Sequence, residues 1–274
     1  MYRILFLLLL CFTLKAGAAT VDTVSITSQK MQKTFRCVVI KPEAYKKKNT
    51  ACPAVYLLHG YSGNYSNWII RVPQLKQFAD TYGVLIVCPD GGYSSWYLDS
   101  PVDSTMRYET YIGTEVPAYI DAHYRTIKRR EGRAITGLSM GGHGGLFLGL
   151  RHAGRFGACG SMSGGVDLYD TRSKFDLVKR VGDTLTHAGN WKQLSVMNVV
   201  EQYPKDSVAI IMDCGVDDFF YDNNRELHEK MVRLKIPHDY IERPGKHNWD
   251  YWAIAVEYQL LFFRNYFDKS KAAQ

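Results

Sequence analysis

The segment Gly137-Leu138-Ser139-Met140-Gly141 places a serine in the pattern G-x-S-x-G. This pattern alone arises by chance in about one chain in ten of this length. Its context is more specific, because "RAITG" before it is typical of a strand and "HGGLFLGLRH" after it of a helix. A sharp turn between strand and helix exposes a serine hydroxyl as a nucleophile. We therefore predict that Ser139 is a nucleophile and that the Met140 N–H, at the start of the helix, stabilises an oxyanion.

A nucleophilic serine needs a base to take its proton and an acid to orient that base. In a strand-turn-helix site of this kind, the chain order is Ser, then Asp or Glu, then His. His247 follows the last predicted strand, "HDYIERPG", and precedes the closing helix, so we expect it at the same sheet edge as Ser139. The other histidines after Ser139 belong to predicted helices, a long insertion or the start of a strand: His143, His152, His187, His228 and His238.

The segment "IIMDCGVDDFF" offers three carboxylates for the acid. Asp213 falls inside a predicted strand that ends at Gly215, so we expect the acid to be Asp217 or Asp218 on the following loop. Spacing alone leaves these two open, and capping of the next helix is an alternative role for both.

A further buried strand ends in His59-Gly60, within "VYLLHGYSGNYSNW". Acyl transfer needs a second oxyanion donor from the loop after this strand, and the backbone N–H of Tyr61 has the expected position. We expect His59 to be a structural hydrogen-bonding residue, because His247 is better placed for catalysis.

Strands and helices alternate along most of the chain, which predicts an α/β fold with a mostly parallel sheet covered by helices on both faces. Residues 21–28 and 34–40 are expected to form an antiparallel pair. A helix over residues 109–124 is expected to be interrupted near Pro117. Residues 91–108 and 165–204 are long for simple connections, and the second contains helix-like pieces, so we expect binding loops or a helical lid.

Four segments together, "LLHGYSGNYSNW", "GLSMGGHGG", "CGVDDFFYDNN" and "PGKHNWDYW", resemble the esterase D family, a branch of the α/β-hydrolases. The resemblance runs over nearly the whole chain after residue 19. It implies an α/β-hydrolase fold and a serine carboxylesterase without a cofactor. It also implies that Ser139 is the nucleophile, His247 the base and Asp218 the acid, with oxyanion donors at Tyr61 and Met140.

The first 19 residues have the pattern of a signal peptide, with Arg3 before an apolar stretch and small residues up to Ala19. The apolar stretch, residues 4–14, is about half as long as a membrane-spanning helix. We expect cleavage after Ala18 or Ala19, export to the periplasm or the medium, and one esterase domain over residues 20–274.

Composition and the lack of certain motifs argue against nucleic-acid binding and against cofactor-dependent catalysis. The net charge of +7 is spread along the chain, and the runs "YKKK" and "KRRE" are typical of solvated surfaces, so we expect no nucleic-acid partner. No metal-binding motif, P-loop or dinucleotide fingerprint occurs, so we expect no cofactor. Five cysteines follow the signal segment, and of these Cys37 with Cys52 is the candidate disulfide.

The resemblance and the predicted export favour short-chain acyl, acetyl or feruloyl esters as substrates, including esters on plant-type polysaccharide. An acyltransferase of the same fold, or a thioesterase like S-formylglutathione hydrolase, is the alternative. Trp96, on the loop "GGYSSWYLDS", is the tryptophan that we expect to bind substrate.

Overall fold

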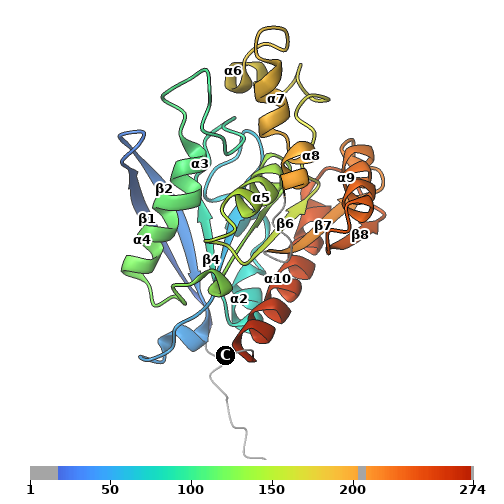
Figure 1. Ribbon diagram of the computed structural model, residues 1–274. Helices are drawn as coiled ribbons and strands as arrows, with labels where there is room; N and C mark the ends of the chain where they lie inside the picture. Colours follow the sequence, from blue (N-terminus) through green and yellow to red (C-terminus); the bar gives the residue numbers. More distant parts are fainter. Residues whose placement is uncertain (1–17, 203–207, 273–274) are drawn as a thin grey trace, which may run out of the picture.

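The computed structural model describes residues 18–202 and 208–272. In this part of the chain, eight strands form one sheet in the order β1-β2-β4-β3-β5-β6-β7-β8. Figure 1 shows this twisted sheet running through the centre of the molecule. The strands are β1 (Thr20–Ser28), β2 (Lys33–Lys41), β3 (Ala54–Leu58), β4 (Leu85–Pro89), β5 (Arg133–Gly137), β6 (Ala158–Met162), β7 (Ala209–Gly215) and β8 (Asp239–Arg243).

The sheet is antiparallel at one edge and parallel over the rest. β1 pairs with β2 and β2 with β4 in antiparallel register, whereas the pairs from β4 through β3 to β8 are parallel. Every residue of β3, β4, β5 and β6 is buried. Burial on both faces explains why these strands appear in the sequence as continuous apolar runs rather than alternating ones. The predicted α/β fold is thus confirmed.

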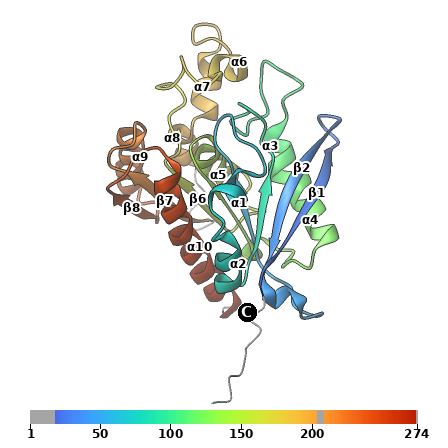
Figure 2. The ribbon, with the colours of Figure 1, turned by 180° about the vertical axis from the view of Figure 1, so that it is seen from behind.

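Helices cover both faces of the sheet. On one face, α5 packs against β3, β5 and β6. On the other, α1, α2 and α10 share a core with alternate residues of the same strands, and Figure 2 shows them on this side. In the described part of the chain, the α-helices of four or more residues are α1 (Asn67–Arg71), α2 (Leu75–Tyr82), α4 (Val116–His123), α5 (Met140–Arg151), α6 (Leu177–Val181), α7 (Ala188–Leu194), α8 (Val196–Val199), α9 (Tyr221–Arg233) and α10 (Trp249–Ala272).

The helix expected over residues 109–124 has the predicted irregularity. A short α3 (Tyr108–Thr110) continues into the π-helical turn η2 (Tyr111–Glu115), and α4 begins immediately afterwards. Pro117 lies in the first turn of α4, directly after the π-helical turn, and its missing N–H cannot bond to a carbonyl of that turn. The interruption therefore widens the helix without ending it.

The long insertion after β6 contains α6, α7 and α8, as the sequence predicted. α6 and α7 stand at the opposite end of the molecule from the C-terminus (Figure 1). Phe175, just before α6, lines the cavity beside Ser139 that is described below. The insertion therefore contributes to the wall of that cavity.

The candidate disulfide between Cys37 and Cys52 does not form, because both residues are buried free thiols. The strand register gives the reason. Cys37 lies opposite Pro89 at one end of β4, whereas Ala54 lies opposite Leu85 at the other end. This register separates the two cysteines by about 20 Å along the strands, whereas a disulfide needs Cα atoms within about 7 Å.

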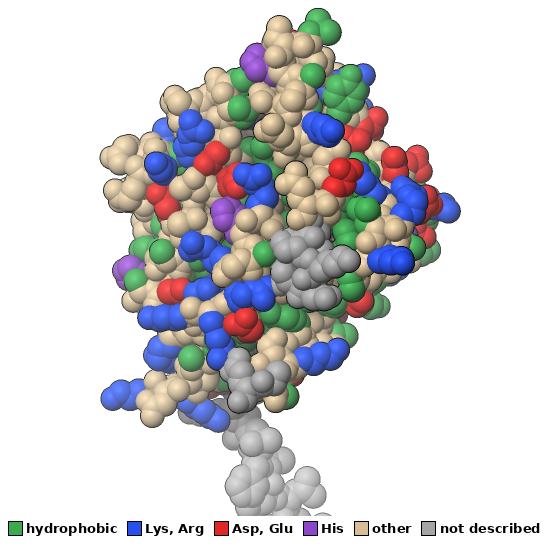
Figure 3. Space-filling view, viewed as in Figure 1, with side chains coloured by type: hydrophobic (Ala, Val, Ile, Leu, Met, Phe, Trp, Pro, Cys, Tyr) green, Lys and Arg blue, Asp and Glu red, His purple; other side chains and the backbone are tan. Residues whose placement is uncertain are grey.

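The surface seen in Figure 3 mixes basic and acidic side chains and shows no single basic stripe. Within residues 18–202 and 208–272, no helix has the length and hydrophobicity to cross a membrane. The predicted signal peptide lies almost entirely outside the described residues, which begin at Ala18.

Candidate active site

Ser139 occupies a strained turn between β5 and α5. Its backbone angles are φ 56° and ψ −117°, in a region that costs a non-glycine residue about 1–3 kcal/mol. Backbone hydrogen bonds hold this conformation. The Ser139 N–H donates to the Met162 carbonyl at 2.9 Å, and the Ser139 carbonyl accepts from Gly142 at 2.9 Å and His143 at 3.0 Å. The turn thereby presents the hydroxyl to a cavity at the carboxyl edge of the sheet.

The glycines of the pentapeptide permit close contact between this turn and β3. A Cβ atom at Gly141 would come within 2.6 Å of the carbonyl oxygens of Leu58 and His59. A Cβ atom at Gly137 would come equally close to the Leu58 carbonyl. Both positions therefore require glycine for backbone packing.

The structure brings Ser139, His247 and Asp218 together. His247 Nε2 lies 2.9 Å from Ser139 Oγ, and His247 Nδ1 lies 2.9 and 2.8 Å from the two carboxylate oxygens of Asp218. In this arrangement the Nδ1–H donates to the carboxylate and Nε2 accepts from the serine hydroxyl. A neutral imidazole in this tautomer can take the hydroxyl proton.

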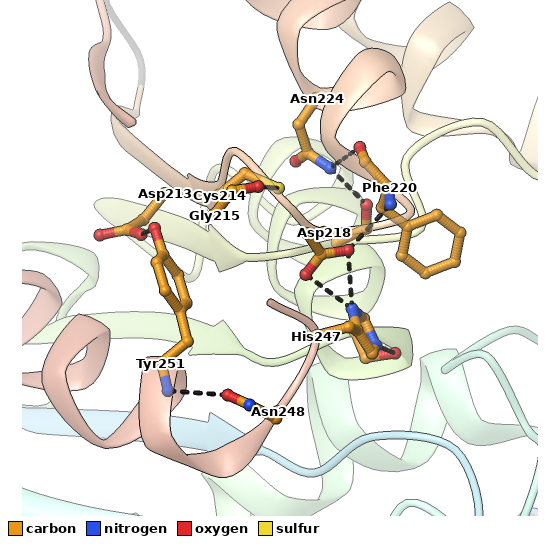
Figure 4. Close-up of polar contacts among 11 residues, drawn as sticks. Asp213, Cys214, Gly215, Asp218, Phe220, Asn224, His247, Asn248 and Tyr251 are labelled. Atoms are coloured by element: carbon orange, nitrogen blue, oxygen red, sulfur yellow. Dashed lines mark hydrogen bonds and ion pairs between the residues drawn. The ribbon is translucent and has the colours of Figure 1, made fainter. Parts of the chain in front are cut away.

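Asp218 is held in place by the start of the segment that follows β7. Its side chain is fully buried, and Oδ1 also accepts from the Phe220 N–H at 2.8 Å. Figure 4 shows the carboxylate between His247 and the Phe220 backbone. Asn224 fixes the same segment by donating to the carbonyls of Phe220 and Gly164. The acid therefore has a single well-supported orientation.

Asp217, the alternative that spacing left open, is exposed. Among the described residues, the carboxylate that hydrogen-bonds His247 belongs to Asp218 and not to Asp217. Its backbone N–H instead donates to Gly245 at 2.9 Å, and the neighbouring Val216 N–H donates to Arg243. These bonds join the loop that holds Asp218 to the loop that holds His247.

Asp213 is buried within β7, where it accepts hydrogen bonds from the Tyr251 hydroxyl and from Arg243. Figure 4 shows it on the opposite side of the loop from Asp218. Burial raises the pKa of Asp213 above its ordinary value, although Tyr251 and Arg243 oppose this effect. The predicted strand position of Asp213 is thus confirmed, and its carboxylate serves a structural network.

The remaining histidines lie away from the Ser139 hydroxyl. Their hydrogen-bond partners are the backbone carbonyls of Trp96 and Leu194 for His143, Glu109 for His152, Thr186 and Asp183 for His187, and His238 for His228. Of the described histidines, His247 alone hydrogen-bonds a serine hydroxyl.

Tyr61, on the loop after β3, lines the same cavity as Ser139. Neither the Tyr61 nor the Met140 N–H has a hydrogen-bond acceptor among the described residues. His59 fixes this loop: its Nδ1 donates to the Gly60 carbonyl at 2.8 Å, and its Nε2 accepts from the Gly91 N–H at 2.7 Å. Burial lowers the pKa of His59, which favours this neutral form.

The cavity in front of Ser139 has a volume of about 470 Å³. Its lining is strongly aromatic and also includes side chains from α1 that the sequence analysis did not select. The ring of Phe219 lies 4.1 Å from the His247 ring and is 62% exposed, so it forms an open apolar surface beside the base. Lining side chains other than Ser139 and His247 include Tyr61, Asn67, Arg71, Phe175, Phe219, Trp249 and Trp252.

Trp96 is not among these residues, and the expectation that it binds substrate needs correction. Its side chain is 1% exposed, and its indole N–H donates to the Phe175 carbonyl at 3.0 Å. The ring therefore supports the cavity wall from behind. Position on a long loop suggested exposure, whereas Trp249 and Trp252, at the start of the closing helix, reach the cavity instead.

In the described part of the chain, no group of three or more His, Cys, Asp or Glu side chains is placed to hold a metal ion.

One family model and several known proteins match the chain. The Esterase model matches residues 28–263. An acetyl esterase of Caldicellulosiruptor saccharolyticus is 30% identical over 210 residues, which are 72% of this chain and 78% of that protein. A solved ferulic acid esterase is 30% identical with a TM-score of 0.78, covering 91% of this chain and 98% of the other. A diacylglycerol acyltransferase/mycolyltransferase, Ag85B of Mycobacterium avium, is 33% identical over 132 residues, 45% of this chain and 39% of that protein.

Proposed function

The chain belongs to the Esterase family and is a carboxylesterase-type hydrolase, and we propose that it cleaves acyl esters through an acyl-enzyme on Ser139. The observation that carries this proposal is the contact of 2.9 Å between Ser139 Oγ and His247 Nε2, with Asp218 on the other side of the ring. This geometry supports a serine, histidine and aspartate acting as one unit.

In the first half of the reaction, Ser139 Oγ attacks the ester carbonyl carbon while His247 Nε2 takes the hydroxyl proton. Asp218 orients the imidazole and stabilises its charged form. The Tyr61 and Met140 N–H groups donate to the tetrahedral oxyanion, and loss of one such donor typically costs about 3 kcal/mol of transition-state stabilisation. The C–O bond then breaks, and the departing alcohol takes the proton from His247.

In the second half, water repeats these steps. His247 removes a proton from water, the hydroxide attacks the acyl-enzyme carbonyl, and Ser139 departs with the proton that His247 returns. The product is a free carboxylic acid, and the enzyme returns to its starting state.

The proposed substrates are esters of short-chain acyl, acetyl or feruloyl groups, including those attached to plant-type polysaccharide. The acetyl esterase and the ferulic acid esterase among the similar proteins support this range. The aromatic lining, with the exposed ring of Phe219 beside His247, is compatible with both small and phenolic acyl groups.

An acyltransferase is the second candidate, because one of the similar proteins, Ag85B, is named an acyltransferase. The same acyl-enzyme would pass its acyl group to a sugar hydroxyl instead of water. Product analysis with and without added sugar acceptor separates the two. Acylated sugar in excess of free acid would identify a transferase.

We also propose that the chain is exported after cleavage of the signal peptide, leaving residues 20–274, or 19–274, as the mature domain. Ala19, at the proposed cleavage site, is buried, and its backbone N–H donates to the Asp80 carboxylate at 2.9 Å. N-terminal sequencing of the protein recovered from the periplasm or medium tests this. Recovery of the intact chain in the cytoplasm would refute export.

The decisive test of function is hydrolysis of p-nitrophenyl acetate, p-nitrophenyl butyrate, methyl ferulate and acetylated xylan by wild type and Ser139→Ala. We expect activity on at least one ester and its loss in the variant. A fluorophosphonate probe, which reacts with activated serines, should label wild type and not Ser139→Ala. Equal activity of the two proteins, or inactivity of both with no labelling, would contradict the assignment.

A further inference from the structure

Two polar side chains of α1 contribute to the lining of the cavity in front of Ser139. Asn67 and Arg71 both line the cavity that contains Ser139 and His247. Because they are four residues apart in a helix, they lie on the same helical face, one above the other. The amide and the guanidinium thus point toward the same region as the proposed reacting centre.

The orientation of α1 is fixed by a buried tryptophan. Trp68 is 0% exposed, and its indole N–H donates to the Leu58 carbonyl at 2.9 Å. Leu58 is the last residue of β3, directly before the loop that holds the Tyr61 N–H. Trp68 also contacts Trp249 edge to face at 5.2 Å. The helix is therefore anchored to the strand that positions the oxyanion loop, so Asn67 and Arg71 have a defined place relative to Ser139.

Both side chains keep unused hydrogen-bond donors. Asn67 Oδ1 accepts from the Asn64 N–H at 2.8 Å, which directs the amide NH₂ away from this bond. Within residues 18–202 and 208–272, neither that NH₂ nor the Arg71 guanidinium has a hydrogen-bond or ion-pair partner. By comparison, Arg133 at the start of β5 pairs with Asp121, and Arg243 at the end of β8 pairs with Asp213.

The cavity has the electrostatics of a site for an anion. Among its lining residues in the described chain, Arg71 carries the one formal charge when His247 is neutral. A guanidinium and an amide NH₂ together match the two oxygens of a singly charged carboxylate. A phosphate monoester would present about two negative charges, more than one guanidinium neutralises.

We propose that Asn67 and Arg71 form a subsite for a carboxylate on the ester substrate, so that the enzyme prefers esters with an acidic group away from the scissile bond. This inference rests on the proposed function, because it concerns the substrate of the same site. The acidic group belongs either to the acyl half or to the alcohol half of the ester, as in a dicarboxylic half-ester or an acylated carboxylic sugar.

Two pairs of esters that differ in charge test the proposal. Mono-4-nitrophenyl succinate against 4-nitrophenyl butyrate places the carboxylate on the acyl half. 4-Acetoxybenzoate against 4-acetoxybenzamide places it on the alcohol half. The measured quantity is kcat/KM for wild type, Arg71→Gln, Arg71→Lys and Asn67→Ala, at low and at high salt. Arg225→Gln, on the exposed surface of α9, is the matched control.

For at least one pair, we expect Arg71→Gln to lower kcat/KM about tenfold on the anionic ester and less than twofold on its neutral partner. Arg71→Lys should restore part of the loss, because it keeps the charge but not the two-pronged donor. Asn67→Ala should lower kcat/KM on the same ester, and salt should weaken the preference in wild type. Arg225→Gln should leave both esters unchanged.

The result that overturns the inference is hydrolysis of the neutral esters by wild type together with equal effects of Arg71→Gln on both members of each pair. The proposed function fails differently, with no hydrolysis of any of the four esters and no fluorophosphonate labelling of Ser139. The two failures are therefore distinguishable.

Discussion

Ser139 keeps a backbone conformation that suits glycine better than serine, and the surrounding hydrogen bonds hold it there. Its hydroxyl is thereby exposed to the cavity at a cost in stability. At the scale of single residues, the proposed chemistry therefore requires serine at position 139, whereas folding stability would favour glycine.

Replacement of Ser139 should reveal that cost. Ser139→Gly and Ser139→Ala should both be inactive, but the glycine variant should be more stable by about 1–2 kcal/mol, because glycine adopts positive φ without strain. Urea denaturation of the two variants measures the difference. Equal stability would show that the turn is not strained by the side chain.

The adjacent carboxylates after β7 give a matched pair for the acid. Asp218→Asn should lower kcat by about 10³–10⁴-fold, because an amide cannot hold the His247 tautomer that accepts the serine proton. Asp217→Asn should stay within about threefold of wild type, since its side chain is exposed. Initial rates on one active ester decide between them, and a larger loss in Asp217→Asn would reverse the assignment.

At the scale of elements, the site is assembled where strands end. β5 leads to Ser139, β7 to Asp218 and β8 to His247, while β3 leads to the loop with the Tyr61 N–H. Parallel strands that start and end together bring these four connections to one edge of the sheet. Arrangement by the sheet explains how residues more than a hundred positions apart come within hydrogen-bond distance.

The loop after β3 should respond to pH through His59. Its folded-state pKa is lowered by burial, whereas its unfolded value is about 6.5. The stabilisation that it provides is therefore complete above about pH 6.5 and is lost as the pH falls through the folded-state value. Between about pH 6.5 and the folded-state pKa, we expect the titration of His59 to decrease the free energy of unfolding by up to about 1.4 kcal/mol per pH unit.

His59→Gln is the control, because glutamine can accept from the Gly91 N–H but does not titrate. Urea denaturation at pH 7.5, 6.5 and 5.5 should show a shallower pH dependence in this variant than in wild type. Identical slopes would mean that His59 does not titrate on unfolding in this range.

Sequence patterns predicted the strands and most helices because buried parallel strands and long helices have distinct periods. They also pointed to Ser139 and His247, which each follow a predicted strand, whereas spacing left Asp217 and Asp218 open and only the family resemblance selected Asp218. They failed where the outcome depends on packing or register. Trp96 is on a loop yet is buried, and Cys37 and Cys52 are close in sequence but lie at opposite ends of the strands.

α1 illustrates a second limit. Nothing in "NWIIR" distinguishes Arg71 from other exposed arginines until Trp68 is seen to anchor the helix beside the oxyanion loop. Polar side chains that line a cavity are recognised only when the cavity walls from distant segments are known. Here those walls come from the loop after β3, the insertion and the start of α10.

At the scale of the whole molecule, all five described cysteines are free and buried. Burial raises the pKa of the thiols of Cys88, Cys159 and Cys214 well above the ordinary value, which makes them poor nucleophiles. The fold is therefore stabilised without a covalent cross-link among these residues.

A protein that starts at Thr20 should show almost no rapidly reacting thiol with Ellman's reagent in the native state and five after denaturation. Dithiothreitol should leave the melting temperature unchanged within about 1 °C, because no disulfide is reduced. Fewer than five thiols under denaturing conditions without reductant, or a lower melting temperature with it, would indicate a cross-link.

The same inaccessible thiols offer an experimental opportunity. Leu185, in the insertion between α6 and α7, is 92% exposed. A cysteine introduced there into the protein that starts at Thr20 would be the single site for a maleimide-linked fluorophore or spin label, with no native cysteine replaced beforehand. Motion of the insertion during turnover could then be followed spectroscopically in a chain that differs from the natural one at one residue.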